Sequence, residues 1–349
     1  MIILPTFDNM KDLLLSLCNY PYDQSSGKRL RELLGSVTEW DNIADLITRH
    51  GITALAAYNI TSAGLSDMLP DHIMGNLEKG WRQSITRNAW LTERWKEVNG
   101  ILTGSGIKHC LLKGMALEYT IYGGLGLRQM NDNDILVKKD EAVRAWQLLQ
   151  DHGFQPEMLK SPLYRKIVAD IGKHLPSLSR DGYSVEIHHR LFFNEEENRV
   201  LESAIDEARS VSVEGTDGYV LRDDIHLKYL IKHMCFHILA GGFQLRLYRD
   251  IELLKPFSGP EVDESCFLMP DRKPGIRQKK KLYRIHFYSV PPRNRFRYLT
   301  GDLFPSVEWL KKRHNCRAPA AVLYYPRRLA KLLWLAGKDR RSDSSTFRF

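Results

Sequence analysis

The apolar pattern of the chain changes abruptly near residue 105, and this change restricts the fold more than any other feature. Residues 71–106 follow the period of an amphipathic helix and end at Gly104-Ser105-Gly106, a sequence typical of a helix C-terminus. Residues 107–114 then form a short apolar run that ends at a glycine, which predicts a buried strand. The chain must therefore combine long helices with a sheet.

Several short elements are predicted directly after this first strand. They are a helix at 115–122, a glycine-rich loop at 123–132, a strand at 133–137, a helix at 139–154, a helical piece near 161–171, and two strands at 173–180 and 183–192. Asp181-Gly182 between the last two strands predicts a hairpin turn. Residues 105–192 are thus expected to form a small α/β unit with a mixed sheet.

Helical periodicity dominates on both sides of this unit, which predicts an α+β fold with flanking helical regions. Residues 222–254 are helical in pattern, 256–300 show little periodicity, and two final helices are expected at 305–315 and 325–337. The expected parts are an N-terminal helical region at 1–105, an α/β core at 106–192, a helical region at 193–255 and a basic C-terminal region with terminal helices at 256–349.

The composition excludes several classes of protein. No stretch approaches the roughly 20 apolar residues that a membrane-spanning helix needs, so no membrane span is expected. The N-terminal residues lack the basic segment and the small-residue cleavage site of a signal peptide. The five cysteines are scattered and none forms a C-x-x-C pair, which favours a reducing cytoplasm over a disulfide framework or a zinc ribbon.

The positive charge is concentrated in the last quarter of the chain. Residues 272–349 hold 21 Lys and Arg but 4 Asp and Glu, whereas the other 271 residues hold 30 basic and 38 acidic residues. Residues 272–297 contain ten basic side chains, four interleaved Tyr or Phe, and no acid. Such a stretch can contact a polyanion such as nucleic acid, and the alternative is a solvated basic face.

Two aspartates begin the strand at 133–137. Asp132 and Asp134 are two residues apart, so they share one face of the strand while Asn133 points away and is expected to tolerate substitution. Side-by-side carboxylates repel each other unless a cation such as Mg²⁺ lies between them. Glu186 is the candidate third carboxylate, because Val185 and Ile187 on either side indicate that it faces away from the core. The alternative interpretation is a solvated turn.

Lys113-Gly114 lies upstream of these carboxylates, where the first strand meets a helix. A glycine at this point can present free backbone N–H groups to a phosphate, and Lys113 adds a positive charge. His233 and His237 have the helical spacing of a metal-binding pair, but position 234 is Met rather than the Glu of an H-E-x-x-H motif. Ordinary core or surface histidines are therefore the alternative for this pair.

The motifs together resemble an uncharacterised nucleotidyltransferase-like family of bacteria, within the polymerase-β-type nucleotidyltransferase superfamily. The matching features are Lys113-Gly114 at a helix start, Tyr122, Arg128 followed by Asp132-x-Asp134, and Glu186-x-His188. The resemblance covers about residues 40–255. The wider superfamily usually has Gly-Ser or Gly-Gly at the helix start, whereas this chain has Lys113-Gly114-Met115.

The resemblance implies a role for each of these residues. Asp132, Asp134 and Glu186 would be the catalytic and metal-binding residues and would hold two Mg²⁺ ions. Lys113, Gly114 and Arg128 would bind the nucleotide. Arg128 has a second interpretation, in which it pairs with a nearby carboxylate and holds the glycine-rich loop. His188 would orient Glu186 or contact the substrate, and a structural hydrogen-bonded histidine is its alternative.

The implied function is a magnesium-dependent nucleotidyltransferase that binds an NTP such as ATP, transfers its NMP group to an acceptor and releases pyrophosphate. The acceptor could be a small metabolite, a peptide or protein, or an RNA. The alternative is a non-catalytic nucleic-acid-binding protein built on a decayed nucleotidyltransferase fold, which the basic stretch at 272–297 would suit.

Overall fold

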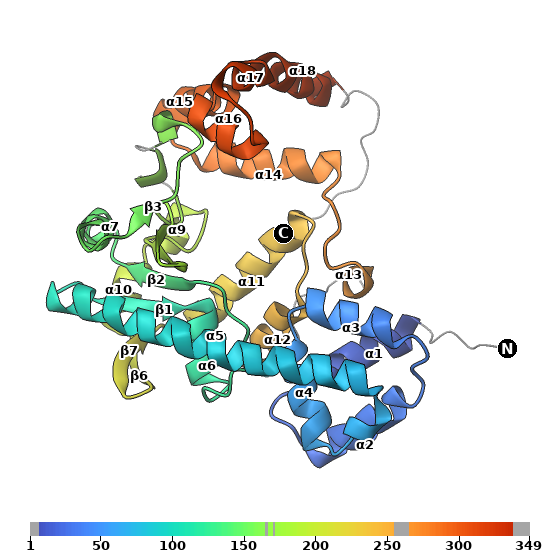
Figure 1. Ribbon diagram of the computed structural model, residues 1–349. Coiled ribbons are helices and arrows are strands. Elements are labelled where there is room, and N and C mark those ends of the chain that lie inside the picture. Colours follow the sequence, from blue (N-terminus) through green and yellow to red (C-terminus); the bar gives the residue numbers. More distant parts are fainter. Residues whose placement is uncertain (1–6, 165–166, 170–171, 255–264, 338–349) are drawn as a thin grey trace.

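The computed structural model describes residues 7–164, 167–169, 172–254 and 265–337 (Figure 1). Helices form most of the chain, and one mixed sheet lies among them. The N-terminal helices and the C-terminal helices lie at opposite ends of the view in Figure 1. The α+β prediction is therefore confirmed. Among the described helices, none has the length and apolar character that crossing a membrane requires.

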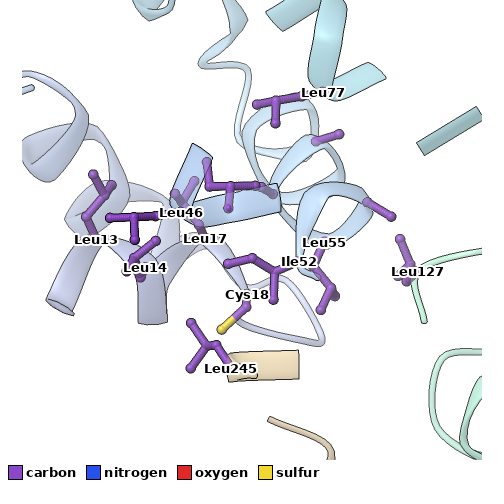
Figure 2. Close-up of a cluster of buried hydrophobic side chains, with 14 of the residues drawn as sticks. Leu13, Leu14, Leu17, Cys18, Leu46, Ile52, Leu55, Leu77, Leu127 and Leu245 are labelled. Carbon is purple, nitrogen blue, oxygen red and sulfur yellow. The ribbon is translucent and has the colours of Figure 1, made fainter. Parts of the chain in front are cut away.

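Residues before the sheet form a helical unit with its own core. Its helices are α1 (Phe7–Leu17), α2 (Gln24–Leu34), α3 (Trp40–Arg49), α4 (Thr53–Ser62), the short 3₁₀ helix η1 (Ser66–Met68) and α5 (Asp71–Gly104). Leu14, Cys18 and Leu55 are fully buried at its centre, and Figure 2 shows them with Leu245 from a distant helix. Apolar side chains at helical spacing bury one face of α3, whereas α4 is buried on nearly all sides at the centre of this unit.

The longest helix, α5, contributes to two separate cores. Ile73, Met74 and Leu77 near its start pack among the N-terminal helices. Leu91, Trp95, Val98 and Leu102 in its second half pack against the sheet. The helix ends at Gly104, and Gly106 two residues later has a φ of 73°, a conformation that glycine adopts without strain.

The sheet has seven strands in the order β3-β4-β5-β2-β1-β7-β6. The strands are β1 (His109–Leu112), β2 (Asn133–Val137), β3 (Gln155–Pro156), β4 (Leu178–Arg180), β5 (Tyr183–His188), β6 (Arg209–Val213) and β7 (Thr216–Val220). At the centre, β2 is antiparallel to β1 and parallel to β5. The predicted turn at Asp181-Gly182 joins β4 to β5, and both of its residues have positive φ.

Helices cover both faces of the sheet. Leu111, Ile135 and Ile187 point to one face and pack against α5 and α7 (Ala142–Asp151). Leu112 and Leu136 point to the other face and pack against α10 (Leu201–Asp206) and α11 (Asp223–Leu239). Two short elements, η2 (Pro162–Tyr164) and α9 (Glu195–Asn198), lie in the connections, and α6 (Lys113–Thr120) follows β1 directly.

The hairpin formed by β6 and β7 was missed by the sequence analysis. It lies within residues 193–255, which were described as helical, and β7 pairs with β1 at the centre of the sheet. Val211 and Val213 alternate with serines, but the charged residues and glycines at 214–218 interrupt this short pattern, so it did not stand out as a hairpin. The division of the chain into four parts stays a prediction.

The C-terminal region is more helical than its sequence pattern indicated. Before it, α12 (Leu245–Leu254) lies in the stretch that was predicted helical. The helices of the C-terminal region are α13 (Ser265–Leu268), α14 (Ile276–Ser289), α15 (Pro292–Leu303), α16 (Val307–His314), α17 (Ala318–Val322) and α18 (Tyr324–Gly337). The two predicted final helices correspond to α16 and α18. Residues 276–303 showed little periodicity because α14 and α15 carry few buried side chains and many basic ones.

Candidate active site

A cavity of about 870 Å³ lies beside the central strands of the sheet, on the face that carries Leu112 and Leu136. Its walls come from the ends of β1, β2 and β5, from residues 172–177, and from α11, α12, α14 and α15. Every candidate site residue predicted from the sequence lines this cavity. The fold therefore brings the predicted site residues together in one cavity.

The parallel pairing of β2 with β5 brings the predicted carboxylates together. Asp134 is directly opposite Glu186, and both side chains point to the cavity face because residues 135 and 187 face the core. His188 lies two residues further along β5, and its Nε2 is 2.8 Å from Asp134 Oδ1 and 3.3 Å from Glu186 Oε2. Two strands thus supply two carboxylates and an imidazole at one point.

Lys113 completes this cluster from the start of α6. Its Nζ donates to Asp134 Oδ1 at 2.6 Å, and its backbone N–H donates to His226 Nε2 at 3.3 Å. The φ of Lys113 is 47°, a left-handed conformation that costs a side-chain-bearing residue about 1 kcal/mol or more. The fold thus holds Lys113 in a strained conformation while its ammonium group contacts Asp134.

Opposite charges set the ionisation of the cluster. Burial disfavours the charge on Asp134, but Lys113 and His188 outweigh burial and hold the pKa of Asp134 well below its usual range. Burial by itself would lower the pKa of Lys113. The negative charge of Asp134 has the larger effect, so the pKa of Lys113 is raised. The hydrogen bond with His188 and the charge of His174 lower the pKa of Glu186 against the effect of burial.

The donor atoms of this cluster suit a divalent cation. One oxygen or nitrogen from each of Asp134, Glu186 and His188 lies within 4.8 Å of the others, close enough to share one ion. Two carboxylates supply the hard oxygen ligands that Mg²⁺ prefers. The residues therefore fit a metal ion, with His188 as a ligand candidate that the predicted set of three carboxylates did not include.

Asp132 lies beside this cluster rather than within it. It directly precedes β2, lines the cavity and is more exposed to solvent than Asp134. Burial by the surrounding cavity and the neighbouring charge of Asp134 raise the pKa of Asp132. Its role as a second metal ligand stays a prediction.

Gly114 is packed tightly at the start of α6. A Cβ atom at this position would lie 2.8 Å from Cγ of Met130, which also lines the cavity. Glycine therefore allows the glycine-rich loop to approach the helix start closely. Nucleotide binding by Gly114 stays a prediction.

Arg128 forms a buried ion pair, which was the second interpretation of this residue. Its Nε donates to Asp250 Oδ2 at 2.7 Å, and the Tyr122 hydroxyl donates to Asp250 Oδ1 at 3.0 Å. Asp250 is fully buried on α12. Arg128 also lines the cavity, so its predicted contact with nucleotide stays open beside this structural role.

The comparisons with known proteins agree with this geometry. A family model described as an uncharacterised nucleotidyltransferase matches residues 36–281, which is most of the chain. The chain belongs to this nucleotidyltransferase family. The matched range contains Lys113, Arg128, Asp134 and Glu186. No curated protein and no solved structure gives a significant match.

The glycine-rich loop of this family member is held by a residue that the sequence analysis missed. Glu118 on α6 is buried, and its carboxylate accepts the backbone N–H groups of Gly126 and Arg128. Burial raises the pKa of Glu118, against the effect of these hydrogen bonds. A glutamate among the apolar residues of a short helix was the available signal, since buried acids are costly without partners.

Asp250 was also missed, although its sequence context gave a signal. It occupies the apolar face of α12 together with Leu247 and Ile251, where an acid requires a buried partner. That partner, Arg128, lies more than 100 residues away in the chain, so spacing alone could not identify it.

The expectation that Asn133 tolerates substitution was wrong. Asn133 does point away from Asp132 and Asp134, but that direction leads into the core, where the side chain is fully buried. Its amide donates to the Leu91 carbonyl oxygen at 3.2 Å and to the Tyr183 hydroxyl at 3.0 Å. Both faces of β2 are buried because helices cover both faces of the sheet.

The cavity wall of the nucleotidyltransferase contains further basic groups. His233 and His237 on α11 are the pair noted from the sequence, and their Nε2 atoms are 3.1 Å apart. Among the described residues, they do not belong to a group of three or more potential metal ligands. Lys173 was not noted from the sequence, and burial together with the charges of Lys113 and Lys232 lowers its pKa to about 8.

Proposed function

We propose that this protein transfers a nucleoside monophosphate from an NTP to the hydroxyl or phosphate group of an acceptor. A new bond forms between an acceptor oxygen and the α-phosphorus of the NTP. The bond from the α-phosphorus to the bridging oxygen breaks, and pyrophosphate leaves with the electron pair. The proton of an acceptor hydroxyl passes to solvent.

A divalent cation such as Mg²⁺, with two ions expected, would neutralise phosphate charge and lower the pKa of the acceptor hydroxyl. Asp134, Glu186 and His188 are the proposed ligands for one ion, and Asp132 the proposed ligand for a second. Lys113 is proposed to exchange its contact with Asp134 for one with the triphosphate. Its ammonium would then stabilise negative charge that develops on the leaving pyrophosphate.

One observation carries this proposal: the pairing of β2 with β5 places Asp134 opposite Glu186 in a cavity that also contains Lys113. Despite burial, contacts with Lys113 and His188 lower the pKa of Asp134, and the hydrogen bond with His188 lowers that of Glu186, so both carboxylates face the cavity in the form that binds a cation. A decayed, non-catalytic fold does not require this ionised pair beside a cavity, which favours the enzyme over the alternative function.

The experiment is a pyrophosphate-release assay with each of the four NTPs, Mg²⁺ and candidate acceptors. Asp134→Asn and Glu186→Gln should each reduce the rate at least about 100-fold, since charge stabilisation of this kind is worth several kcal/mol. Chelation of divalent cations should abolish activity.

Glu157→Gln is the matched control, because Glu157 lines the same cavity outside the carboxylate cluster and should leave the rate within about twofold. Activity that survives Asp134→Asn and Glu186→Gln together would contradict the proposal.

The proposal also covers the class of acceptor, the contact of residues 272–297 with a polyanion, and the location of the protein. The acceptor is a small metabolite, a peptide or protein, or an RNA, and the basic residues at 272–297 would contact it if it is a polyanion. The proposed location is the cytoplasm, in keeping with five cysteines that are all free thiols.

A further inference from the structure

We propose that a groove between α9 and the α14–α15 corner binds single-stranded RNA and guides its end into the active-site cavity as the acceptor. This inference rests on the proposed function and narrows its acceptor to one class. The groove is a second hollow of about 540 Å³. It shares Phe193, Ser289 and Val290 with the 870 Å³ cavity, so the two spaces are adjacent.

The groove carries an excess of positive charge. Lys139, Arg190, Arg293 and Arg295 line it, and Glu195 is its one lining carboxylate. Lys139 and Arg190 both contact Glu195, at 3.2 and 2.8 Å. Arg293 is exposed and forms no ion pair with any carboxylate in the described parts of the chain. A phosphate backbone is the polyanion that such a row of cations neutralises.

An aromatic side chain stands beside these cations. Tyr288 lines the groove and is 59% exposed, which is unusual for a large ring in a folded protein. The Arg295 guanidinium lies 5.2 Å from its ring centre and donates to the Val290 carbonyl oxygen at 3.0 Å. An exposed ring next to a fixed cation forms a platform on which an unpaired base can stack.

These features favour RNA as a single strand. Bases are free to stack on Tyr288 only when they are not paired, which excludes a duplex in the groove. The Asn194 amide and the Ser289 hydroxyl also line the groove, and the Ser289 oxygen is free to accept because its proton goes to the His286 carbonyl oxygen. Such groups can bond a 2′-hydroxyl, which DNA lacks.

Part of the groove lies outside the range that the family model matches. The family match ends at residue 281, whereas Tyr288, Arg293 and Arg295 lie beyond it. The same segment supplies His286, Ser289, Val290 and Tyr298 to the wall of the active-site cavity. A segment outside the matched range that forms part of both spaces is suited to select the acceptor.

The test measures binding of a fluorescein-labelled 12-nucleotide RNA by fluorescence anisotropy, without NTP or Mg²⁺, from 50 to 300 mM salt. Tyr288→Ala should weaken binding at least about fivefold through lost stacking, and Tyr288→Phe should retain it. Arg293→Ala should weaken binding and reduce the salt dependence by about 0.7 in log–log slope, the contribution of one phosphate contact.

The matched controls are Tyr219→Ala and Lys79→Ala. Tyr219 is an exposed tyrosine with Lys108 Nζ 5.2 Å from its ring, and Lys79 is an exposed lysine on α5, both outside the groove. Both variants should bind RNA as the unaltered protein does. Equal losses in the controls and the groove variants, equal affinity for DNA of the same sequence, or absence of RNA binding would each overturn the inference.

A second arm follows NMP transfer from labelled NTP to the RNA with Mg²⁺. Arg293→Ala and Tyr288→Ala should lower transfer to RNA in proportion to lost binding, while Asp134→Asn should bind RNA normally and transfer nothing. Pyrophosphate release with other acceptors, together with absence of RNA binding, would contradict this inference. The proposed function would be unaffected. RNA binding without transfer to RNA would refute RNA as the acceptor, whereas absence of transfer to every acceptor tested would refute the proposed function.

Discussion

At the scale of single residues, Lys113 combines strain and charge in one position. Its φ of 47° directs the chain from β1 into α6, and its ammonium contacts Asp134. His226 accepts the Lys113 N–H and so supports the strained conformation from α11. Glycine would adopt this backbone without cost, so the presence of lysine indicates that the charge is needed there.

Two substitutions at this position should separate strain from charge. Lys113→Ala and Lys113→Gly both remove the ammonium group, but only glycine relieves the left-handed backbone. Lys113→Gly should therefore be more stable than Lys113→Ala by about 1 kcal/mol, measured by urea unfolding. Both should be equally poor in NMP transfer. Equal stability of the two variants would show that the backbone here is not strained.

At the scale of elements, the glycine-rich loop is fixed from two sides. From α6, Glu118 accepts two of its N–H groups. From α5, the Asn88 amide donates to the Arg128 carbonyl oxygen at 3.0 Å, and Trp81 Nε1 donates to the Leu125 carbonyl oxygen at 3.1 Å. These hydrogen bonds therefore fix the loop that leads to Asp132 and Asp134, and Gly126 allows it to pack closely against α5.

Gly126 and Gly123 allow this packing to be measured. Both have φ near 70°, so alanine is strained equally at each position. A Cβ at Gly126 would lie 2.9 Å from the Ile85 Cα on α5, whereas a Cβ at Gly123 would meet no atom within 4 Å. Gly126→Ala should lower the free energy of unfolding by about 1–3 kcal/mol more than Gly123→Ala. A smaller loss at Gly126 would mean that the loop moves away from α5 easily.

The sequence predicted helices and strands correctly where a local pattern is enough to determine the element. The strand at 133–137 and the hairpin at Asp181-Gly182 were correct because apolar runs and turn residues act locally. The sequence did not predict α14 and α15, because their basic, half-exposed faces show little apolar periodicity. It also did not predict the β6–β7 hairpin.

The site was predictable in part for the same reason. Strand alternation made Glu186 the candidate third carboxylate and placed His188 on the same face of its strand, and the family resemblance supported both residues. The pairing of Asp134 with Glu186 depends on which strands are neighbours, which no local pattern determines. The contact of His188 with Asp134, and Asp250 as the partner of Arg128, likewise follow from packing between distant segments.

At the scale of the whole molecule, buried histidines should make stability depend on pH. Burial lowers the pKa of His226 and of His189 to about 4, from 6.5 in the unfolded chain. Between pH 6.5 and 4 the unfolded chain therefore binds protons that the folded chain does not, and the free energy of unfolding falls as pH falls. Each histidine should contribute about 2–3 kcal/mol across this interval.

Urea unfolding at pH 7.5, 6.5, 5.5 and 4.5 measures this loss. His226→Gln removes one titrating group, so its stability should fall less steeply with pH than that of the unaltered protein. His72→Gln is the control, because His72 is 66% exposed, and should leave the slope unchanged. A slope in His226→Gln identical to that of the unaltered protein would mean that His226 is charged in the folded state.

One helix, α5, contributes side chains to two hydrophobic clusters of the molecule. Helix α5 is 34 residues long, about 50 Å, and its two halves belong to different hydrophobic clusters. Unfolding of either cluster would leave one half of α5 without packing partners. A helix without tertiary packing loses most of its stability. The N-terminal bundle and the sheet are therefore mechanically coupled. The protein should therefore unfold as one cooperative unit when either part is destabilised.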